Sequence, residues 1–216
     1  MESGPIQKLT IDEIITLFSI EENLSGAGEL SPNIFPGQAI MAIIFDGKRK
    51  LVQLRWGLVP GWLTDTGRGQ IHARAETVNV KPFFKDSFHR RRALVVTAGY
   101  YQWKKTGTDK TPYYIRMKTG LPFLMAALYE RSEEGGGVIG TCAIITTEAN
   151  DLVRPIHNRM PVIIDPEDMM PWLDAATGEE RLMALLRSPG PAPLELVPGR
   201  FVEKQFVPLV RKPLNG

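Results

Sequence analysis

Residues 156–162 bring together an imidazole, an amide and a guanidinium, carried by His157, Asn158 and Arg159. The segment lies between two apolar runs, residues 142–145 and 161–164. Loops between buried strands commonly carry the polar groups that act on ligands. An imidazole can exchange a proton near neutral pH, and a guanidinium can hold a phosphate by two hydrogen bonds. Considered alone, the segment is better explained by an ordinary half-buried histidine and a surface arginine.

A second group of titratable residues occurs at positions 72–77, where His72, Arg74 and Glu76 alternate with alanine or threonine. If this segment is extended, the three side chains point to the same side of the strand. A face with so many polar groups is either solvated or lines a cleft. His72 and His157 would form an acid–base pair if the two segments faced each other.

Composition sets outer limits on function. The chain has 216 residues, of which 43% are hydrophobic and 23% charged, with a formal net charge of +2. These values are typical of a globular protein without a strong overall electrostatic field. Binding to nucleic acid would need a local basic patch, such as residues 90–92 with Lys85 and His89. The same triplet is equally well explained as the solvated start of a strand.

The single cysteine, Cys142, lies in an apolar run and is expected in the core. It cannot form an intramolecular disulfide, and the sequence has no cysteine–histidine cluster for zinc. We expect no metal and no cofactor. The N-terminus lacks signal-peptide character, and no apolar run is long enough to cross a membrane. A cytoplasmic protein without membrane contact is therefore expected.

The sequence pattern predicts one mixed α+β domain over residues 1–216, dominated by antiparallel strands in a curled or barrel-like sheet with a few short helices. A first helix is expected over residues 10–20, because Thr10 and Glu13 have capping-box spacing. Later short helices are expected after Asp165 and after Thr177. Strands are expected at 39–45 paired with 51–56, at 94–96, at 113–117 paired with 122–129, at 138–147 and at 201–210.

Five segments in this order resemble one family, the SRAP family of SOS response-associated peptidases, also called abasic-site processing proteins. They are residues 33–38, 56–62, 73–77, 99–103 and 145–161, and the resemblance spans about residues 9–210. It implies a compact β-rich fold with a groove for single-stranded DNA. It also implies capture of the ring-opened aldehyde of an abasic site, first as a Schiff base and then as a thiazolidine on an N-terminal cysteine. Separately, we expect the protein to be a monomer.

The resemblance implies a role for each matching residue. His157 matches the histidine that promotes opening of the sugar ring, and Arg159 matches an arginine that contacts phosphate. Arg74 and Glu76 match the arginine and glutamate of one family motif. Two further positions, Pro36 and Trp62, match residues that wedge against bent DNA. Stacking of an indole on an unpaired base contributes roughly 1–3 kcal/mol whatever the base.

Three central positions depart from the family pattern. Ser3 stands in place of the N-terminal cysteine, and the large Glu2 before it leads us to expect that Met1 is retained. A serine hydroxyl is a much weaker nucleophile than a thiol. His72 replaces an asparagine, and Gln102 replaces a glutamate and so lacks its titratable proton. We therefore expect DNA binding to be kept and crosslinking to be weakened or lost.

Two other functions stay open at this point. One is a peptidase or other hydrolase that acts through His157 with Ser3 or another hydroxyl, although the sequence has no Asp–His arrangement near Ser3. The other is a non-catalytic interaction module in which the motif residues only hold the fold. Gly99 and Trp103 are expected to serve packing, and the neighbouring Tyr100 and Tyr101 to divide between core and groove.

Overall fold

A computed structural model describes residues 10–26, 33–63, 69–131, 138–187, 194–202 and 205–209. The helices are α1 (Ile11–Leu17), α2 (Pro82–Arg90), the short 3-10 helix η1 (Pro166–Asp168), α3 (Met169–Leu173) and α4 (Glu179–Arg187). The strands are β1 (Glu22–Asn23), β2 (Ala39–Phe45), β3 (Arg49–Trp56), β4 (His72–Arg74), β5 (Arg92–Thr97), β6 (Tyr100–Thr106), β7 (Asp109–Met117), β8 (Phe123–Arg131), β9 (Val138–Glu148), β10 (Arg159–Pro161), β11 (Ile163–Ile164), β12 (Leu194–Val202) and β13 (Gln205–Pro208). No described helix has the length and apolarity needed to span a bilayer.

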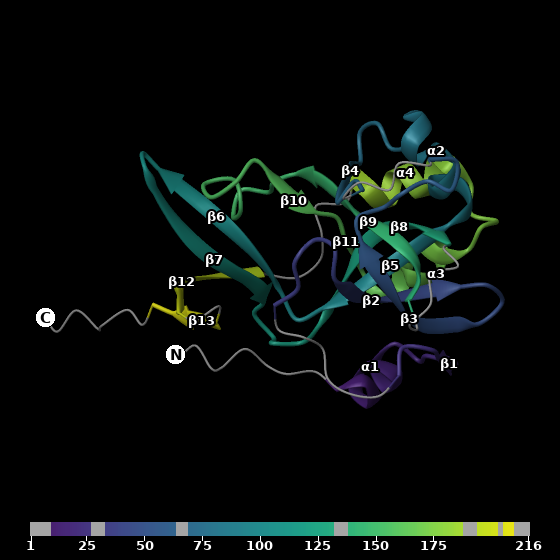
Figure 1. The fold of residues 1–216 in the computed structure, drawn as a ribbon, viewed down its shortest axis with the longest axis horizontal. Helices are drawn as coiled ribbons and strands as arrows, with labels where there is room; N and C mark the ends of the chain where they lie inside the picture. Colours follow the sequence, from purple (N-terminus) through teal and green to yellow (C-terminus); the bar gives the residue numbers. More distant parts are fainter. Residues whose placement is uncertain are drawn as a thin grey trace, which may run out of the picture.

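The larger sheet closes into a barrel. Its neighbouring strands β3, β2, β5, β8 and β9 pair antiparallel in that order, and β9 then pairs with β3 in parallel. Arg55 of β3 lies opposite Thr141 of β9 at this closing seam. The strand-dominated α+β fold with a curled, barrel-like sheet is thus confirmed (Figure 1).

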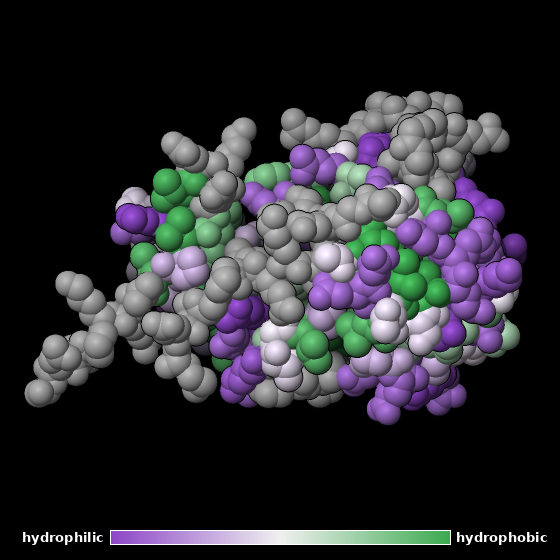
Figure 2. All heavy atoms as spheres, turned by 90° about the horizontal axis from the view of Figure 1, so that it is seen from below, coloured by the Kyte–Doolittle hydropathy of each residue, from purple (hydrophilic) through white to green (hydrophobic). Residues whose placement is uncertain are grey.

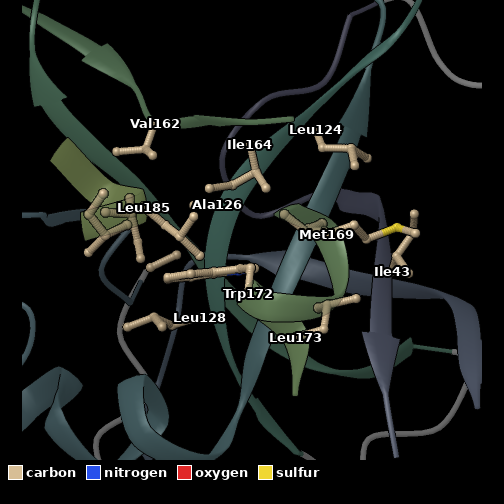
Figure 3. Packing of buried hydrophobic residues seen from close by; sticks show 14 of the residues in the cluster. Ile43, Leu124, Ala126, Leu128, Val162, Ile164, Met169, Trp172, Leu173 and Leu185 are labelled. Atoms are coloured by element: carbon tan, nitrogen blue, oxygen red, sulfur yellow. The ribbon is translucent and has the colours of Figure 1, made fainter. Parts of the chain in front are cut away.

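The barrel strands are apolar on both faces because both faces are covered. In β8, Leu124, Ala126 and Leu128 pack in one cluster with the helices, whereas the alternating Met125 and Ala127 belong to a second cluster on the opposite face. Trp172 of α3 is fully buried in the first cluster (Figure 3), and its indole N–H donates to the Ala93 carbonyl at 2.9 Å. Such two-sided burial explains the continuous apolar sequence of this strand.

A smaller sheet extends from the barrel at the left of Figure 1. Its strand order is β13-β12-β7-β6, and β6 and β7 form a hairpin that turns at Gly107, where φ is +60°. The expected pairing of residues 113–117 with 122–129 was wrong. Residues 113–117 pair with β6 and β12, whereas 123–131 pair with β5 and β9. The turn at 118–120 carries the chain from one sheet to the other, and turn residues do not reveal which strands they join.

For the remaining elements, patterns of neighbouring residues predicted the helix starts correctly but missed one helix and one hairpin. The capping box of α1 is confirmed, since the Thr10 hydroxyl accepts from the Glu13 N–H at 3.2 Å and the Glu13 carboxylate accepts from the Thr10 N–H at 2.8 Å. The late helices are confirmed as η1–α3 and α4. Helix α2 was missed. The single strand expected at 201–210 is instead the end of β12 and β13, which form a hairpin.

Two arginines of the basic triplet at residues 90–92, Arg91 and Arg92, serve the fold. Arg92 is 2% exposed, and its guanidinium donates to the carbonyls of Trp172, Phe88, His89 and Asp174 at 2.6–2.7 Å. Arg91 is ion-paired with Glu130 at 2.7 Å and with Asp86. These two arginines form neither a patch for nucleic acid nor a solvated strand start. Their guanidinium groups already bind carbonyl and carboxylate groups of the protein.

Candidate functional site

A pocket of about 800 Å³ opens between the barrel and the small sheet. It brings together residues that are far apart in the sequence: His72 and Arg74 from β4, Gln102 from β6, and His157 and Arg159 at the start of β10. The other lining residues are Asn33, Ile34, Phe35, Pro36, Ile40, Trp56, Val96, Thr97, Ala98, Gly99, Tyr100, Tyr101, Trp103, Tyr114, Met125, Ile144, Thr146, Met160, Pro161 and Phe201.

Strand β4 presents His72 and Arg74 to the pocket. It pairs in parallel with β9, with His72 opposite Ile144 and Arg74 opposite Thr146, while Ala73 between them is fully buried. The alternation expected for this segment is thus confirmed for these two residues, and the face lines a cleft. No hydrogen bond or ion pair is formed by the Arg74 guanidinium with other described residues, so it remains available to a ligand.

The His72 ring is held against Trp56. The two ring centroids lie 5.9 Å apart in an edge-to-face arrangement, and the Trp56 indole N–H donates to the Ile71 carbonyl at 2.9 Å. His72 is accessible through the pocket, but desolvation by the surrounding walls lowers its pKa, and electrostatic interaction with His157 and Arg159 lowers it further. Its imidazole is therefore neutral at neutral pH and can accept a proton.

His157 is positioned by its own backbone loop. The Asn150 side-chain oxygen accepts from the Val153 N–H at 3.0 Å, and the His157 N–H donates to the Val153 carbonyl at 3.0 Å. The ring Nδ1 lies 3.1 Å from both the backbone nitrogen and the carbonyl oxygen of Arg159. It accepts from the N–H when the ring proton is on Nε2 and donates to the carbonyl when the proton is on Nδ1. His72 and His157 thus border the same pocket, as the proposed acid–base pair requires.

Arg159 is engaged by a carboxylate. It donates two hydrogen bonds to Glu76, at 2.7 and 3.0 Å, and its guanidinium also contacts the carbonyl and hydroxyl of Thr146. The Arg159 side chain is 22% exposed. Hydrogen bonding to Arg159 lowers the Glu76 pKa, so this carboxylate stays charged. Within the described part of the chain, Arg159 is therefore paired with a carboxylate and Arg74 is not.

Aromatic side chains form the wall contributed by the small sheet. Tyr100 and Tyr101 both border the pocket, so they do not divide between core and groove as expected. The Tyr100 hydroxyl is buried with no partner in the described part of the chain, and burial raises its pKa. Burial also raises the pKa of Tyr101 to about 12. Gly99 serves packing as expected, since a Cβ there would lie 2.5 Å from the Tyr114 ring.

Other residues singled out in the sequence lie in different places. Pro36 borders the pocket, whereas Trp62 does not line it and packs edge-to-face on Phe83 at 6.2 Å, with 66% of its surface exposed. Ser3 lies outside the described residues. Cys142 is fully buried, and burial raises its pKa to about 12, which confirms the expected core position. Among described residues no three histidine, cysteine or acidic side chains gather as metal ligands.

Sequence reasoning missed several contributors to the site. Trp56 appeared only as the end of an expected strand and in the matched segment 56–62, and Thr146 only within an expected strand and the matched segment 145–161, yet they hold His72 and Arg159 in place. Thr146 lies next to the apolar run, and its position in the Ile-Thr-Thr-Glu segment was the available signal. Phe201 had no signal, because its place in the pocket depends on pairing of β12 with β7.

Comparisons with known proteins agree on one family. The family model SRAP, described as SOS response associated peptidase, matches residues 6–200. Abasic site processing protein YoqW of Bacillus subtilis is 39% identical over 184 residues, which cover 82% of each chain. Protein YoaM of the same organism, also an abasic site processing protein, is 39% identical over 183 residues, 81% of this chain and 80% of that one. A solved structure from Bacteroides thetaiotaomicron has 27% identity and a TM-score of 0.66, covering 80% of this chain and 77% of that chain.

Proposed function

This chain belongs to the SRAP family, and from that membership we propose that it binds single-stranded DNA at abasic sites without forming a stable crosslink. The observation that carries the proposal is the pocket in which His72, Arg74 and His157 meet. Relatives at 39% identity are named abasic site processing proteins. The residues present therefore decide which steps of such processing this chain can perform.

The pocket has the groups needed to hold a baseless sugar and its phosphate. The Arg74 guanidinium, which has no hydrogen-bond or ion-pair partner among the residues that the structure describes, can hold a phosphate by a forked hydrogen bond. The neutral His72 can accept a proton from a sugar hydroxyl, and His157, in the tautomer that accepts from the Arg159 N–H, can donate its Nε2 proton to the ring oxygen as the sugar opens. Trp62, exposed beside α2, and Pro36 at the pocket edge would contact the bases on either side.

The groups needed for a permanent bond are missing. A thiazolidine requires a thiol next to a free amine, and the chain's sole cysteine, Cys142, is fully buried in β9. Gln102 borders the pocket but cannot shuttle a proton. An amine alone can form a Schiff base with the aldehyde, and water can reverse it. Capture of the lesion is therefore reversible.

A hydrolase triad receives no support from the same geometry. In a triad, a carboxylate holds the Nδ1 side of the histidine and a hydroxyl lies at Nε2. The Nδ1 of His157 is instead held by the backbone of Arg159. No described hydroxyl or carboxylate side chain hydrogen bonds to this ring. Peptidase activity through His157 is thus not proposed.

Fluorescence anisotropy with a labelled single strand that carries a stable abasic analogue tests the proposal. The protein should bind it at about 50 mM salt, more tightly than an intact strand, with an affinity that falls as salt rises. Arg74→Ala should weaken binding and reduce the salt slope by about 0.7, the share of one phosphate contact. The control is Arg187→Ala, which removes an exposed arginine at the end of α4.

Denaturing electrophoresis tests the missing crosslink. After incubation with a natural abasic site, no protein–DNA band should survive denaturation, whereas borohydride should trap a Schiff base. A band that survives without reductant would contradict reversible capture. Absence of binding by the unaltered protein at low salt would contradict the proposed function itself.

A further inference from the structure

We infer that the β6–β7 hairpin and the C-terminal strands form a second part of the DNA site, which stacks an unpaired base next to the abasic sugar and holds the adjoining phosphates. The inference rests on the proposed function and extends it to the strand that flanks the lesion. It is carried by two features of the small sheet: a stacked aromatic pair and a pair of opposed lysines.

The aromatic pair consists of Trp103 and Phe201. Their ring centroids lie 5.7 Å apart with an interplanar angle of 26°, and Trp103 is 43% exposed. Tyr101 supports Phe201 from within the sheet at 5.2 Å. Both members of the pair border the pocket. An abasic nucleotide has no base, so this aromatic wall fits the base of the neighbouring nucleotide.

The lysine pair consists of Lys105 and Lys110. Opposed residues of an antiparallel ladder share a face, and Trp103 lies opposite Pro112 while Lys105 lies opposite Lys110. Lys105 therefore follows Trp103 on the same face, roughly 7 Å further along the strand. Like charges in directly opposed positions destabilise a hairpin. Neither ammonium has a carboxylate partner among the described residues, and a phosphodiester between them would neutralise this repulsion.

The arrangement favours a single strand of nucleic acid over other polyanions. A basic surface tracks the phosphates, and an adjoining aromatic surface accepts bases only when they are unpaired. The hairpin projects from the body at the left of Figure 1, and Figure 2 shows hydrophobic surface at this end of the molecule beside a hydrophilic tip. Strand and lesion would thus run from the pocket outward along the hairpin.

Part of this surface lies beyond the residues matched by the family model. The match ends at residue 200, and the wall is completed by Phe201 and Phe206. Phe206 packs on Gly199, where a Cβ would lie 2.1 Å from its ring, so β13 is seated closely on β12. The Phe206 ring in turn contacts Phe201, with ring centroids 5.6 Å apart, and so supports it from the side of β13.

Fluorescence anisotropy with two labelled single-stranded oligonucleotides distinguishes the contribution of base stacking from that of electrostatic attraction. Both carry a central abasic analogue; in one the flanking nucleotides keep their bases, and in the other they are abasic analogues too. Phe201→Leu should lower affinity for the first strand roughly 5- to 150-fold and leave the second unchanged, because only the first offers a base to stack. Phe201→Tyr keeps the aromatic face and should bind both strands like the unaltered protein.

The lysine pair is tested with the same strands. Lys105→Ala/Lys110→Ala should weaken binding of both and reduce the salt slope by about 1.4, the value for two single-strand phosphates. The charge-matched control is Lys48→Ala/Lys118→Ala, which removes two exposed lysines at other turns. Thermal unfolding of each variant checks that the fold is kept.

The outcomes separate this inference from the proposed function. If Arg74→Ala weakens binding while the Phe201→Leu and double-lysine variants bind both strands normally, the pocket binds DNA and the inference is wrong. An equal loss in the control double variant would also overturn it, because the effect would be general charge. Equal affinity for a duplex would contradict base stacking. Failure of the unaltered protein to bind any strand removes both proposals together.

Discussion

At the scale of single residues, His72 shows how a substitution changes the chemistry of the pocket. The SRAP family resemblance places an asparagine at this position, which does not titrate. The imidazole lies against Trp56, and desolvation together with electrostatic interaction with His157 and Arg159 lowers its pKa below the ordinary value of 6.5. The pocket therefore gains a neutral base at physiological pH and gains charge only in acid.

The pH dependence of stability follows from this shift. Below about pH 6.5 the unfolded chain binds a proton at His72 more readily than the folded chain does. The contribution of neutral His72 to the free energy of unfolding is therefore fully present above that pH, and it is lost as the pH falls toward the pKa of the folded state. Urea unfolding between about pH 7.5 and 5.5 should show a smaller loss for His72→Asn than for the unaltered protein. An equal loss in both would contradict the lowered pKa.

At the scale of elements, close packing between β8 and β9 depends on a missing side chain. A Cβ at Gly140 would lie 2.0 Å from the Glu130 carbonyl oxygen, and this neighbour is backbone that cannot turn away. Gly140→Ala should therefore destabilise the protein by about 1–3 kcal/mol. Gly61→Ala, which meets nothing within 4 Å, is the control. The free energy of unfolding in urea measures both, and similar values for the two variants would disprove the packing argument.

Elements also show what the sequence alone could predict. The capping box at Thr10 and Glu13 is a local pattern, and it marked the start of α1 correctly. Strand partners depend on distant residues, so the hairpin expected at 113–117 and 122–129 was wrong although both strands exist. Helix α2 was missed because its N-cap residue, Lys81, forms no side-chain capping bond, so the sequence carries no capping motif at its start.

The same contrast holds for the site. Motif residues at 72–74 and 157–159 were expected to meet, and they border one pocket. The pairing of Arg159 with Glu76 depends on side-chain geometry across 83 residues, and spacing could not reveal it. DNA contacts, a monomeric state and a cytoplasmic location stay predictions.

At the scale of the whole molecule, Arg92 joins the helical layer to the barrel. Its buried guanidinium donates to carbonyls of α2 and of the α3 region from the first position of β5. Arg92→Met should destabilise the protein by about 2–4 kcal/mol, because several buried carbonyls lose their donor at once. Arg90→Met, at an exposed neighbour, should change stability by less than about 0.5 kcal/mol. Equal shifts in the urea midpoint would show that Arg92 does not join the layers.

The burial of the only thiol has a practical consequence. Because Cys142 is fully enclosed in β9, maleimide dyes cannot reach it while the chain is folded. A cysteine introduced at Thr106, at the tip of the β6–β7 hairpin, would then be the sole reactive position in the native protein. One substitution thus places a fluorescent dye where the bound DNA strand is expected to leave the protein surface. Energy transfer from this dye to a labelled oligonucleotide would give the direction in which the strand runs.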